Sequence, residues 1–460
     1  MPFNLAARST GKTIPLTALT EDGLQAWLAK AGKSTSTWVE AAHFTAAACE
    51  TLLVPKGDGT VAGALLGIED ANDVWSWSAA VGKLPPGRYM LTNNIAKSQA
   101  TNAALGWALG TYSFDRYLKA KKPEAELVWP ARADRDAVLG AASSVALTRD
   151  LINMPASDMG PAELAAVARK LAREFKAKFS VIVGQELLKK NFPMVHAVGR
   201  ASDRAPRLID IRWGKASDPK VTIVGKGVCF DSGGLDLKPP TGMKMMKKDM
   251  GGAANALGLA RMIMMAGLPV RLRVLVPAVE NSVSGNAFRP LDVLQSRAGI
   301  TVEIGNTDAE GRLILADALY EGASEKPEMM VDFATLTGSA RVALGPELPV
   351  MFANNDELAA DLAKHGAIVG DPVWRLPLWK PYLRTLKSNV ADLNNIGEMS
   401  QGGAITAALF MNEFVDSRVP WAHFDIMAWN TSSRPGRPAG GEAMAMRAAF
   451  ATIVARFGSS

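Results

Sequence analysis

Cysteine and histidine are both scarce in this chain of 460 residues. The two cysteines, Cys49 and Cys229, cannot form a disulfide framework, which fits the reducing environment of the cytoplasm. No His-Glu-x-x-His pattern occurs, so we interpret every histidine as a packed or surface residue. The histidines are His43, His196, His365 and His423. A metal site in this chain would therefore have to be rich in carboxylates.

The chain also lacks a long apolar run and a strong charge excess. No stretch reaches the length of a membrane span, and residues 1–22 carry no basic segment followed by an unbroken apolar core, so we expect neither a transmembrane helix nor a signal peptide. The formal net charge of +6 is mild and argues against nucleic acid as the main partner. With 48% hydrophobic and 21% charged residues, the composition is that of a globular cytoplasmic protein that buries a large core.

The length and the distribution of prolines and charges predict two or three domains. Residues 1–130 alternate short apolar runs with helical patterns, which predicts a smaller N-terminal α/β domain. The charged segment 119–130 contains two prolines and marks its end. A helical pattern that stops before Pro155 predicts a connecting helix within residues 131–153. Residues 154–460 would form the larger, catalytic domain.

Strand candidates alternate with helical patterns in the larger domain. They are residues 179–183, 207–213, 221–224, 271–276 and 329–333. This alternation predicts an α/β fold with a mainly parallel central sheet covered by helices. Because ligands of such sheets bind at the carboxyl ends of the strands, we expect the functional residues there.

A glycine-rich segment follows the strand candidate at 221–224. From Gly225 to Gly234 it reads Gly-Lys-Gly-Val-Cys-Phe-Asp-Ser-Gly-Gly, and its glycines permit tight turns and a close approach to a ligand. Lys226 could be a surface lysine, and Asp231 could simply cap a turn. A lysine held at a strand end, however, would lose its proton easily and could then offer an amine to a metal.

Two further segments carry carboxylates to the start of helix candidates. Asp249 precedes two glycines and the helix candidate 255–266, where it could serve merely as the N-cap. The segment 306–313 reads Asn-Thr-Asp-Ala-Glu-Gly-Arg-Leu and places Asp308 and Glu310 two residues apart. A solvated acidic turn is the commoner fate of such a pair, because burying two carboxylates side by side costs heavily unless a cation compensates.

Considered together, three carboxylate-bearing loops near candidate strand ends favour a shared cation site. Four acidic ligands roughly neutralise two divalent ions, and carboxylate oxygens suit Mn²⁺, Mg²⁺ or Zn²⁺. Two such ions, roughly 3.5–4 Å apart, are the usual device for activating water in aminopeptidases and phosphatases. A dinuclear phosphoesterase would need similar carboxylates but usually also histidines, which are scarce here.

In residue type, order and spacing, these motifs resemble the cytosolic leucyl aminopeptidase family. The motifs are Lys226–Gly234 with Lys238, Asp249–Ala253 and Asn306–Leu313. The segments Glu280–Leu294, Ala334–Gly338 and Ala391–Asn395 are similar to the family as well. The resemblance covers most of the chain from about Arg149 onward and is weak in the N-terminal part.

The resemblance implies a dinuclear metallo-aminopeptidase, a hydrolase that assembles as a homohexamer and removes N-terminal residues from peptides. Its cofactors would be two divalent ions per subunit, Zn²⁺ or Mn²⁺, together with bicarbonate. A hydroxide held between the ions would attack the peptide, and the free α-amino group would bind one metal. A DNA-binding regulator is a second hypothesis, since some bacterial members of the family also bind DNA, but the mild charge argues against it as the main role.

The resemblance also assigns roles to individual residues. Those expected to hold metal, with Asp231 and Glu310 bridging both ions, are Lys226, Asp231, Asp249, Asp308 and Glu310. Lys238 would polarise the scissile carbonyl, and Arg312 would hold bicarbonate as the general base, although Arg312 could instead form a simple ion pair. The backbone amides that would help to hold bicarbonate are those of Ala309, Gly311 and Leu336.

The side-chain pocket is also implied by the resemblance. Met246, Thr335 and Gly338 match pocket-lining positions of the family and favour an apolar, leucine-like residue. Residues 424–430 depart from the pattern expected there. Met427 stands where a small residue is usual, and Trp429 and Asn430 add bulk and polarity, so we expect a shallower or differently selective pocket.

Overall fold

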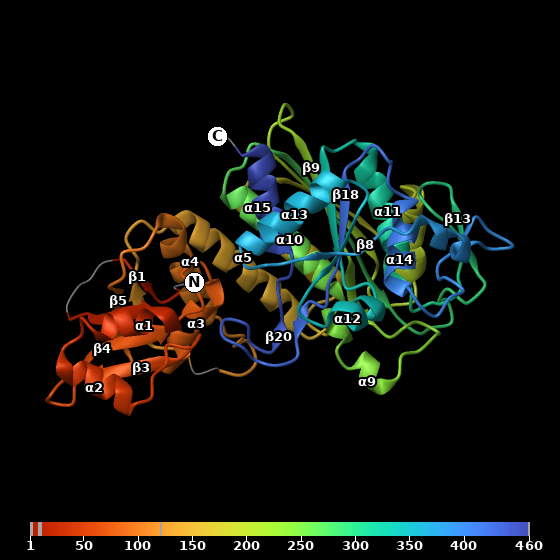
Figure 1. Cartoon of the computed structure of the whole chain (residues 1–460). Coiled ribbons are helices and arrows are strands. Elements are labelled where there is room, and N and C mark those ends of the chain that lie inside the picture. Colours follow the sequence, from red (N-terminus) through yellow and green to blue (C-terminus); the bar gives the residue numbers. More distant parts are fainter. Residues whose placement is uncertain (1–2, 8–11, 120–121, 459–460) are drawn as a thin grey trace. The chain divides into compact units, whose positions relative to one another are not determined.

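The structure is a computed structural model that describes residues 3–7, 12–119 and 122–458 (Figure 1). The chain divides into two compact units. The smaller unit comprises Met1–Ala146 together with Ser432–Ala439, and the larger unit comprises Leu147–Thr431 with Gly440–Ser460. The division after Ala146 falls inside helix α5 (Arg135–Asn153). Among the described residues, no helix is both long enough and apolar enough to cross a membrane.

The smaller unit is built on a six-stranded sheet. In spatial order the strands are β1 (Leu5–Ala6), β6 (Ala125–Val128), β5 (Gly87–Leu91), β2 (Ile14–Leu19), β4 (Val61–Gly67) and β3 (Thr51–Pro55). All neighbouring pairs are parallel except β3 and β4. The helices are α1 (Glu21–Leu28), α2 (Lys33–Ala41), α3 (Val74–Lys83) and α4 (Lys97–Gly110). Trp77 and Trp107 lie in its apolar core.

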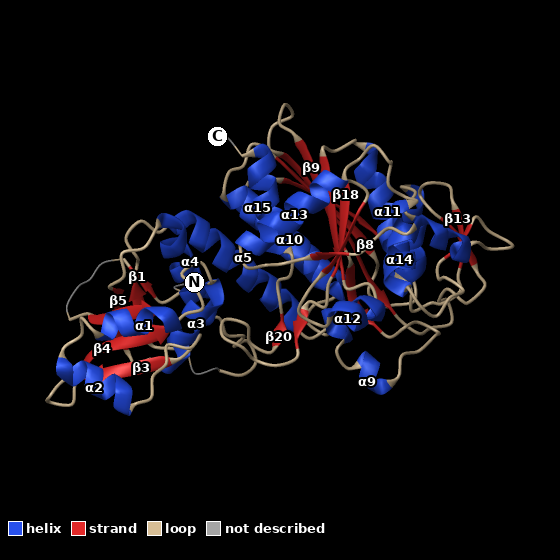
Figure 2. Cartoon of the chain, viewed as in Figure 1, coloured by secondary structure: helices blue, strands red, loops and turns tan. Residues whose placement is uncertain are grey.

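The larger unit is built on a nine-stranded sheet (Figure 2). In spatial order the strands are β16 (Trp374–Arg375), β15 (Val350–Ala353), β18 (Trp421–Asp425), β14 (Met329–Ala334), β9 (Lys220–Gly225), β11 (Arg271–Asn281), β8 (Arg207–Trp213) and β7 (Lys178–Val183), and β10 (Gly227–Asp231) pairs with β11. The central strands β18, β14, β9 and β11 are parallel, whereas β15 is antiparallel to β18, β8 is antiparallel to β11, and β7 is antiparallel to β8. The α/β class with a mainly parallel central sheet is therefore confirmed, with antiparallel strands on both sides of the parallel centre.

Helices α10 (Gly251–Met265) and α11 (Gly311–Ser324) cover opposite faces of this sheet. Gly225 faces α10, since a Cβ at Gly225 would lie 2.7 Å from the Cβ of Ala256. Thr222 faces α11, because its methyl group would lie 3.1 Å from a Cβ added at Gly322. Side chains three positions apart on a strand point to opposite faces, so the two helices enclose β9 from both sides.

Shorter elements and further helices complete the larger unit. The helices are α6 (Pro161–Glu174), α7 (Glu186–Lys189), α8 (Pro193–Gly199), α9 (Pro240–Met243), α12 (Gly338–Leu344), α13 (Asp356–Ile368), α14 (Gly403–Asn412) and α15 (Met446–Phe457), with the 3₁₀ turns η1 (Met246–Met250) and η2 (Lys380–Leu386). Two small sheets consist of β12 (Val293–Gln295), β13 (Thr301–Glu303) and β17 (Leu393–Asn394), and of β19 (Trp429–Asn430) and β20 (Gly440–Gly441).

The central parallel strands end side by side. Gly225 of β9 is paired with Phe333 of β14, and Ala334 of β14 is paired with Asp425 of β18. Asp231, the last residue of β10, lies opposite Asn281, the last residue of β11. The segments that begin after these residues therefore leave the sheet at one edge, which is where ligands bind in sheets of this kind.

Candidate active site

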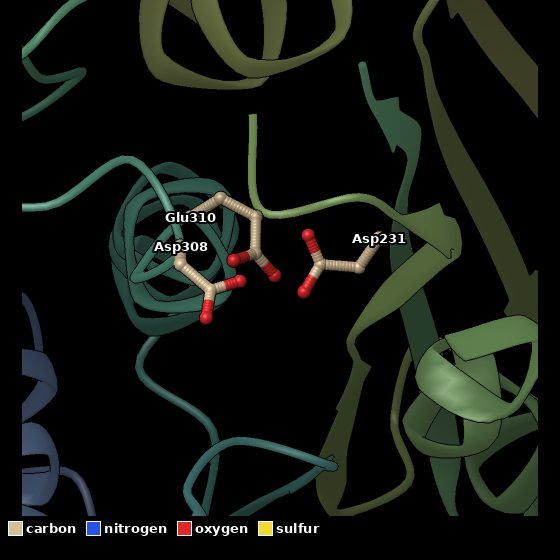
Figure 3. A group of neighbouring side chains, drawn as sticks. All are labelled: Asp231, Asp308 and Glu310. Atoms are coloured by element: carbon tan, nitrogen blue, oxygen red, sulfur yellow. The ribbon is translucent and has the colours of Figure 1, made fainter. Parts of the chain in front are cut away.

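Three carboxylates from separate parts of the sequence converge beyond this sheet edge. Asp231 ends β10, Asp308 lies in the loop before α11, and Glu310 is the residue that precedes its first turn. Figure 3 shows their carboxylate groups pointing toward one another, and one oxygen from each lies within 4.8 Å of the others. Asp231 and Glu310 are buried, and Asp308 is partly exposed.

Lys226 lies against this cluster as a buried ammonium. Its Nζ is 2.7 Å from Oδ2 of Asp249 and 2.9 Å from Oε1 of Glu310, and its side chain is only 3% exposed. Gly311 makes room for it, because a Cβ there would lie 2.5 Å from Cε of Lys226. Lys226 is therefore not a surface lysine, and Asp249 is not an N-cap, since α10 begins after Met250 without a side-chain cap.

The protonation of Lys226 depends on these carboxylates. Burial alone would lower the pKa of Lys226, but Asp249 and Glu310 raise it well above its ordinary value. The proton that we expected Lys226 to lose easily is thus held by the neighbouring negative charges. A divalent cation among the same carboxylates would replace that positive charge and allow the lysine to act as a neutral ligand.

Lys238 lies on the other side of the cluster. Its ammonium contacts a carboxylate oxygen of Asp308 and lies 2.8 Å from Oδ2 of Asp231. Asp231 also accepts a hydrogen bond from the amide of Gly233, with a distance of 2.9 Å from N to Oδ1. The turn-capping role considered for Asp231 is therefore present together with its place in the cluster.

The carboxylate oxygens suit divalent cations. Asp249 Oδ2, Asp308 Oδ1 and Glu310 Oε1 are buried, and the partners that the described residues give them are the ammonium groups of Lys226 and Lys238. Burial and the neighbouring charge of Asp231 raise the pKa values of Asp308 and Glu310. Crowded, desolvated carboxylates with free lone pairs are stabilised by bound cations, so this donor set fits metal.

Arg312 lies in the first turn of α11 and is also buried. Its Nη1 donates to the carbonyl oxygen of Asn395 at 2.7 Å, and burial lowers its pKa to about 10. Within the described part of the chain it forms no ion pair, and its Nε has no hydrogen-bond partner. The simple ion pair considered for this residue is thus not observed, and a free donor remains for an anion.

The three amides expected near that anion differ in their surroundings. The amide of Leu336 donates to Oδ1 of Asp425 at 3.0 Å, and the amide of Ala309 donates to the carbonyl oxygen of Asn306 at 3.3 Å. Gly311 is the first residue of α11, where backbone N–H groups have no acceptor within the helix. Two of the three amides therefore already have protein partners.

Side chains that the sequence did not single out position the cluster. Asn281 Nδ2 donates to Asp231 Oδ1 at 2.9 Å and to the carbonyl oxygen of Thr307 at 3.1 Å. Asn395 accepts from the amide of Gly305 at 2.7 Å and donates to the carbonyl oxygen of Asn306 at 2.7 Å. Both asparagines lie within segments that resemble the family, so a signal was present, but nothing in the sequence showed which residues they contact.

A cavity of about 630 Å³ opens beside the cluster. The pocket residues expected from the sequence, Met246, Thr335 and Gly338, line it together with Met427. Trp429 and Asn430 have other contacts. The Lys247 Nζ lies 5.5 Å from the centre of the Trp429 ring, and Asn430 Nδ2 donates to Glu442 Oε2 at 2.6 Å. Neither Trp429 nor Asn430 is among the described residues that line the cavity.

Comparisons with known proteins agree with this geometry. Residues 146–450 match the model of the cytosol aminopeptidase family, catalytic domain, and residues 14–130 match that of the M17 aminopeptidase N-terminal domain. The probable cytosol aminopeptidase of Roseiflexus castenholzii is 41% identical over 363 residues, which cover 75% of this chain and 74% of the relative.

Solved structures give the same result for the whole fold. The crystal structure of cytosol aminopeptidase from Coxiella burnetii is 48% identical, covers 99% of both chains and superimposes with a TM-score of 0.95. The bottromycin maturation enzyme BotP in complex with Mn is 32% identical, covers 97% of this chain and 100% of its own, and has a TM-score of 0.88. The chain therefore belongs to the cytosol (leucyl) aminopeptidase family, a metal-dependent family of hydrolases, and is an aminopeptidase that acts on peptides.

Proposed function

We propose that this aminopeptidase uses two divalent cations to remove N-terminal residues, preferentially apolar ones such as leucine. The observation that carries the proposal is the convergence of the carboxylates of Asp231, Asp308 and Glu310, one oxygen from each lying within 4.8 Å of the others. When bound there, two divalent cations would lower the pKa of water enough to supply a nucleophile at neutral pH.

The metal ligands would be Lys226, Asp231, Asp249, Asp308 and Glu310. Their four carboxylates would balance the charge of two cations, and the oxygen-rich set suits Mn²⁺ or Zn²⁺. The relative BotP, solved in complex with Mn, supports manganese as one candidate. Asp231, Asp308 and Glu310 would hold the cations together, which the close approach of their oxygens supports.

Lys238 and Arg312 would act on the substrate and the proton. Lys238, whose ammonium reaches the edge of the cluster, would polarise the scissile carbonyl and stabilise the developing oxyanion. Arg312, with its unpaired Nε, would hold bicarbonate, which supplies a general base. The first-turn amide of Gly311 is the best placed of the three proposed amide donors. The amides of Ala309 and Leu336 already donate to protein oxygens, so each would have to divide its hydrogen between that oxygen and the bicarbonate.

The remaining parts of the proposal concern the pocket and the assembly. Met246, Thr335 and Gly338 would receive the N-terminal side chain, and Met427 would narrow the space. All of these residues fall in the proposed catalytic domain, residues 154–460, with 131–153 as the connector. A cytoplasmic location is supported by the relatives called cytosol aminopeptidase. Assembly as a homohexamer is supported by the exposed side chains of Trp374 and Trp379, which an interface would cover.

The test compares leucine p-nitroanilide with its N-acetylated form in the presence of Mn²⁺ or Zn²⁺. We expect cleavage of the free amine only, and equal cleavage of the acetylated substrate would contradict the requirement for a free N-terminus. Asp231→Ala should abolish activity and keep the fold, whereas Asp203→Ala, at an exposed aspartate of the same unit, should retain activity. Full activity of Asp231→Ala would remove it from the metal site.

A further inference from the structure

Lys248 is a buried cation in the wall of the substrate cavity that the proposed mechanism does not use. It lies in η1 between Met246 and Asp249, is 6% exposed and lines the same cavity as the carboxylate cluster. Among the described residues its side chain forms no ion pair and no hydrogen bond. Burying an unpaired ammonium costs free energy of folding, and an anion bound beside it would offset that cost.

Two carboxylates that line the same cavity as Lys248, those of Asp249 and Asp425, are already engaged. Asp249 accepts the Lys226 ammonium at 2.7 Å and a hydrogen bond from Thr335 Oγ1 at 2.7 Å. Asp425 accepts from the amides of Leu336 and Thr337 and from the Thr337 hydroxyl, the last at 2.6 Å. Neither carboxylate forms an ion pair with Lys248.

A second cation and two methionines share this wall. Arg341 lines the same cavity as Lys248, and its Nη1 lies 4.0 Å from the sulfur of Met427. Met246 and Met427 offer apolar surface for methylene groups. This wall therefore combines an apolar surface with an excess of positive charge.

We propose that Lys248 is a specificity-determining residue that admits an N-terminal residue with a carboxylate side chain, glutamate or aspartate. This inference rests on the proposed aminopeptidase function and extends its substrate class beyond leucine-like residues. Met246 and Met427 would contact the methylene groups, and the ammonium of Lys248 would pair with the side-chain carboxylate. Glutamate should therefore be cleaved better than glutamine, which has the same shape without the charge.

The test uses full-length protein with Mn²⁺ and the p-nitroanilides of glutamate, glutamine, aspartate and leucine. For the wild type we expect kcat/KM for glutamate to exceed that for glutamine about tenfold or more, as one desolvated ion pair allows. Lys248→Met should reduce this ratio to about one or below, and Lys248→Arg should restore most of it. Lys247→Met is the matched control, because Lys247 donates to the carbonyl oxygen of Asn153 at 2.6 Å and lies over Trp429, so the ratio should stay at the wild-type value.

The outcomes separate this inference from the proposed function. If the wild type cleaves none of the four p-nitroanilides, including that of leucine, the proposed function is overturned. Cleavage of the leucine compound with a glutamate-to-glutamine ratio near one in the wild type would overturn only the role of Lys248. One more outcome would overturn only the role of Lys248. In that outcome, Lys248→Met leaves the glutamate-to-glutamine ratio unchanged but changes the preference for the dipeptide Leu-Gly over Leu-Gly amide. Lys248 would then bind the C-terminal carboxylate of the substrate.

Discussion

Asn395 connects several parts of the loop that carries Asp308 and Glu310. Its side chain bonds the backbone at Gly305, Asn306 and Ala309, and its own carbonyl oxygen accepts from Arg312. It is fully buried and comes from the segment after β17, far from that loop in the sequence. The position of Asp308 and Glu310 thus depends on a residue that binds no metal in the proposed site.

Replacing Asn395 with alanine should weaken both the fold and the metal site. The change leaves buried backbone amides and carbonyls without partners, so we expect the free energy of unfolding to fall by about 3 kcal/mol. Metal affinity should fall too, because the loop that carries Asp308 and Glu310 loses its support. Urea unfolding and titration with Mn²⁺ measure the two effects.

Asn394 offers a neighbouring control for this change. It is half-buried and makes longer hydrogen bonds, to Glu303 at 3.3 Å and from the amide of Ile396 at 3.1 Å. Asn394→Ala should therefore cost about 1 kcal/mol. If the two variants bind Mn²⁺ equally well, Asn395 does not position the loop.

His423 makes the stability of the larger unit depend on pH. It is fully buried on β18, and its Nδ1 lies 2.7 Å from Oδ1 of Asp332. Burial alone would lower the pKa of His423, but Asp332 and Asp425 raise it above its ordinary value of 6.5. The charged pair therefore stabilises the fold fully below pH 6.5, and this contribution is lost as the pH rises through the higher, folded-state pKa.

The variant His423→Gln should remove this contribution. We expect the free energy of unfolding of the wild type to exceed that of the variant by more at pH 6 than at pH 9. Urea unfolding at both pH values measures the difference. A gap that widens with rising pH would show that the histidine is neutral in the folded protein.

At the scale of single elements, the start of α10 is set by a close approach between backbones. A Cβ at Gly252 would lie 2.1 Å from the carbonyl oxygen of Phe333 and 2.8 Å from the amide nitrogen of Lys226. The helix therefore begins directly against the ends of β9 and β14. This contact places Asp249, just before the helix, beside Lys226.

Gly252→Ala should separate these elements, because neither backbone atom can move independently. We expect a loss of about 3 kcal/mol in the free energy of unfolding, as in other overpacked cores. Gly140→Ala is the control: Gly140 also lies in a helix, α5, but a Cβ there meets no atom within 4 Å, so alanine should stabilise by up to about 1 kcal/mol. Thermal or urea unfolding distinguishes the two, and equal effects would mean that the contact does not determine the helix position.

The strand β10 shows where a local sequence pattern is insufficient. We expected Gly227 to Asp231 to belong to a glycine-rich loop, but the segment pairs with the end of β11. Its short apolar stretch is flanked by glycines, which typically mark turns, and its strand conformation depends on a partner about fifty residues later in the sequence. Asp231 therefore lies at a strand end.

At the scale of the whole molecule, local patterns predicted the parallel centre of the sheet and the convergence of carboxylates from separate loops. The candidates 221–224 and 329–333 fall within β9 and β14, because buried parallel strands form continuous apolar runs. The antiparallel pairing of β8 with β11 and β7, and of β15 with β18, could not be predicted, since the same apolar pattern fits either direction. The contacts of Asn395 and Asp425 with the site also depend on long-range packing.

Removing metal should affect the larger unit selectively. All five proposed ligands lie in that unit, and a cation at 100 times its dissociation constant would stabilise it by about 2.7 kcal/mol. Lys226 and Lys238 partly neutralise the carboxylates, so we expect the chelated protein to remain folded but to unfold at a lower temperature. Calorimetry with and without EDTA should show a shift in the transition of the larger unit, and an unchanged transition would argue against metal in this cluster.

The smaller unit contains residues from near the end of the chain, and this affects the order in which the protein can fold. Ser432–Ala439 belong to this unit, where the Arg437 guanidinium lies 3.7 Å from the Trp75 ring and Gly436 lies against Ser78. Synthesis on the ribosome runs from the N-terminus, so the first 146 residues emerge long before the segment that completes their unit. The N-terminal part can thus form its sheet early, but its final packing must wait until almost the whole polypeptide has been made. A recombinant fragment that ends at residue 146 would lack this segment permanently.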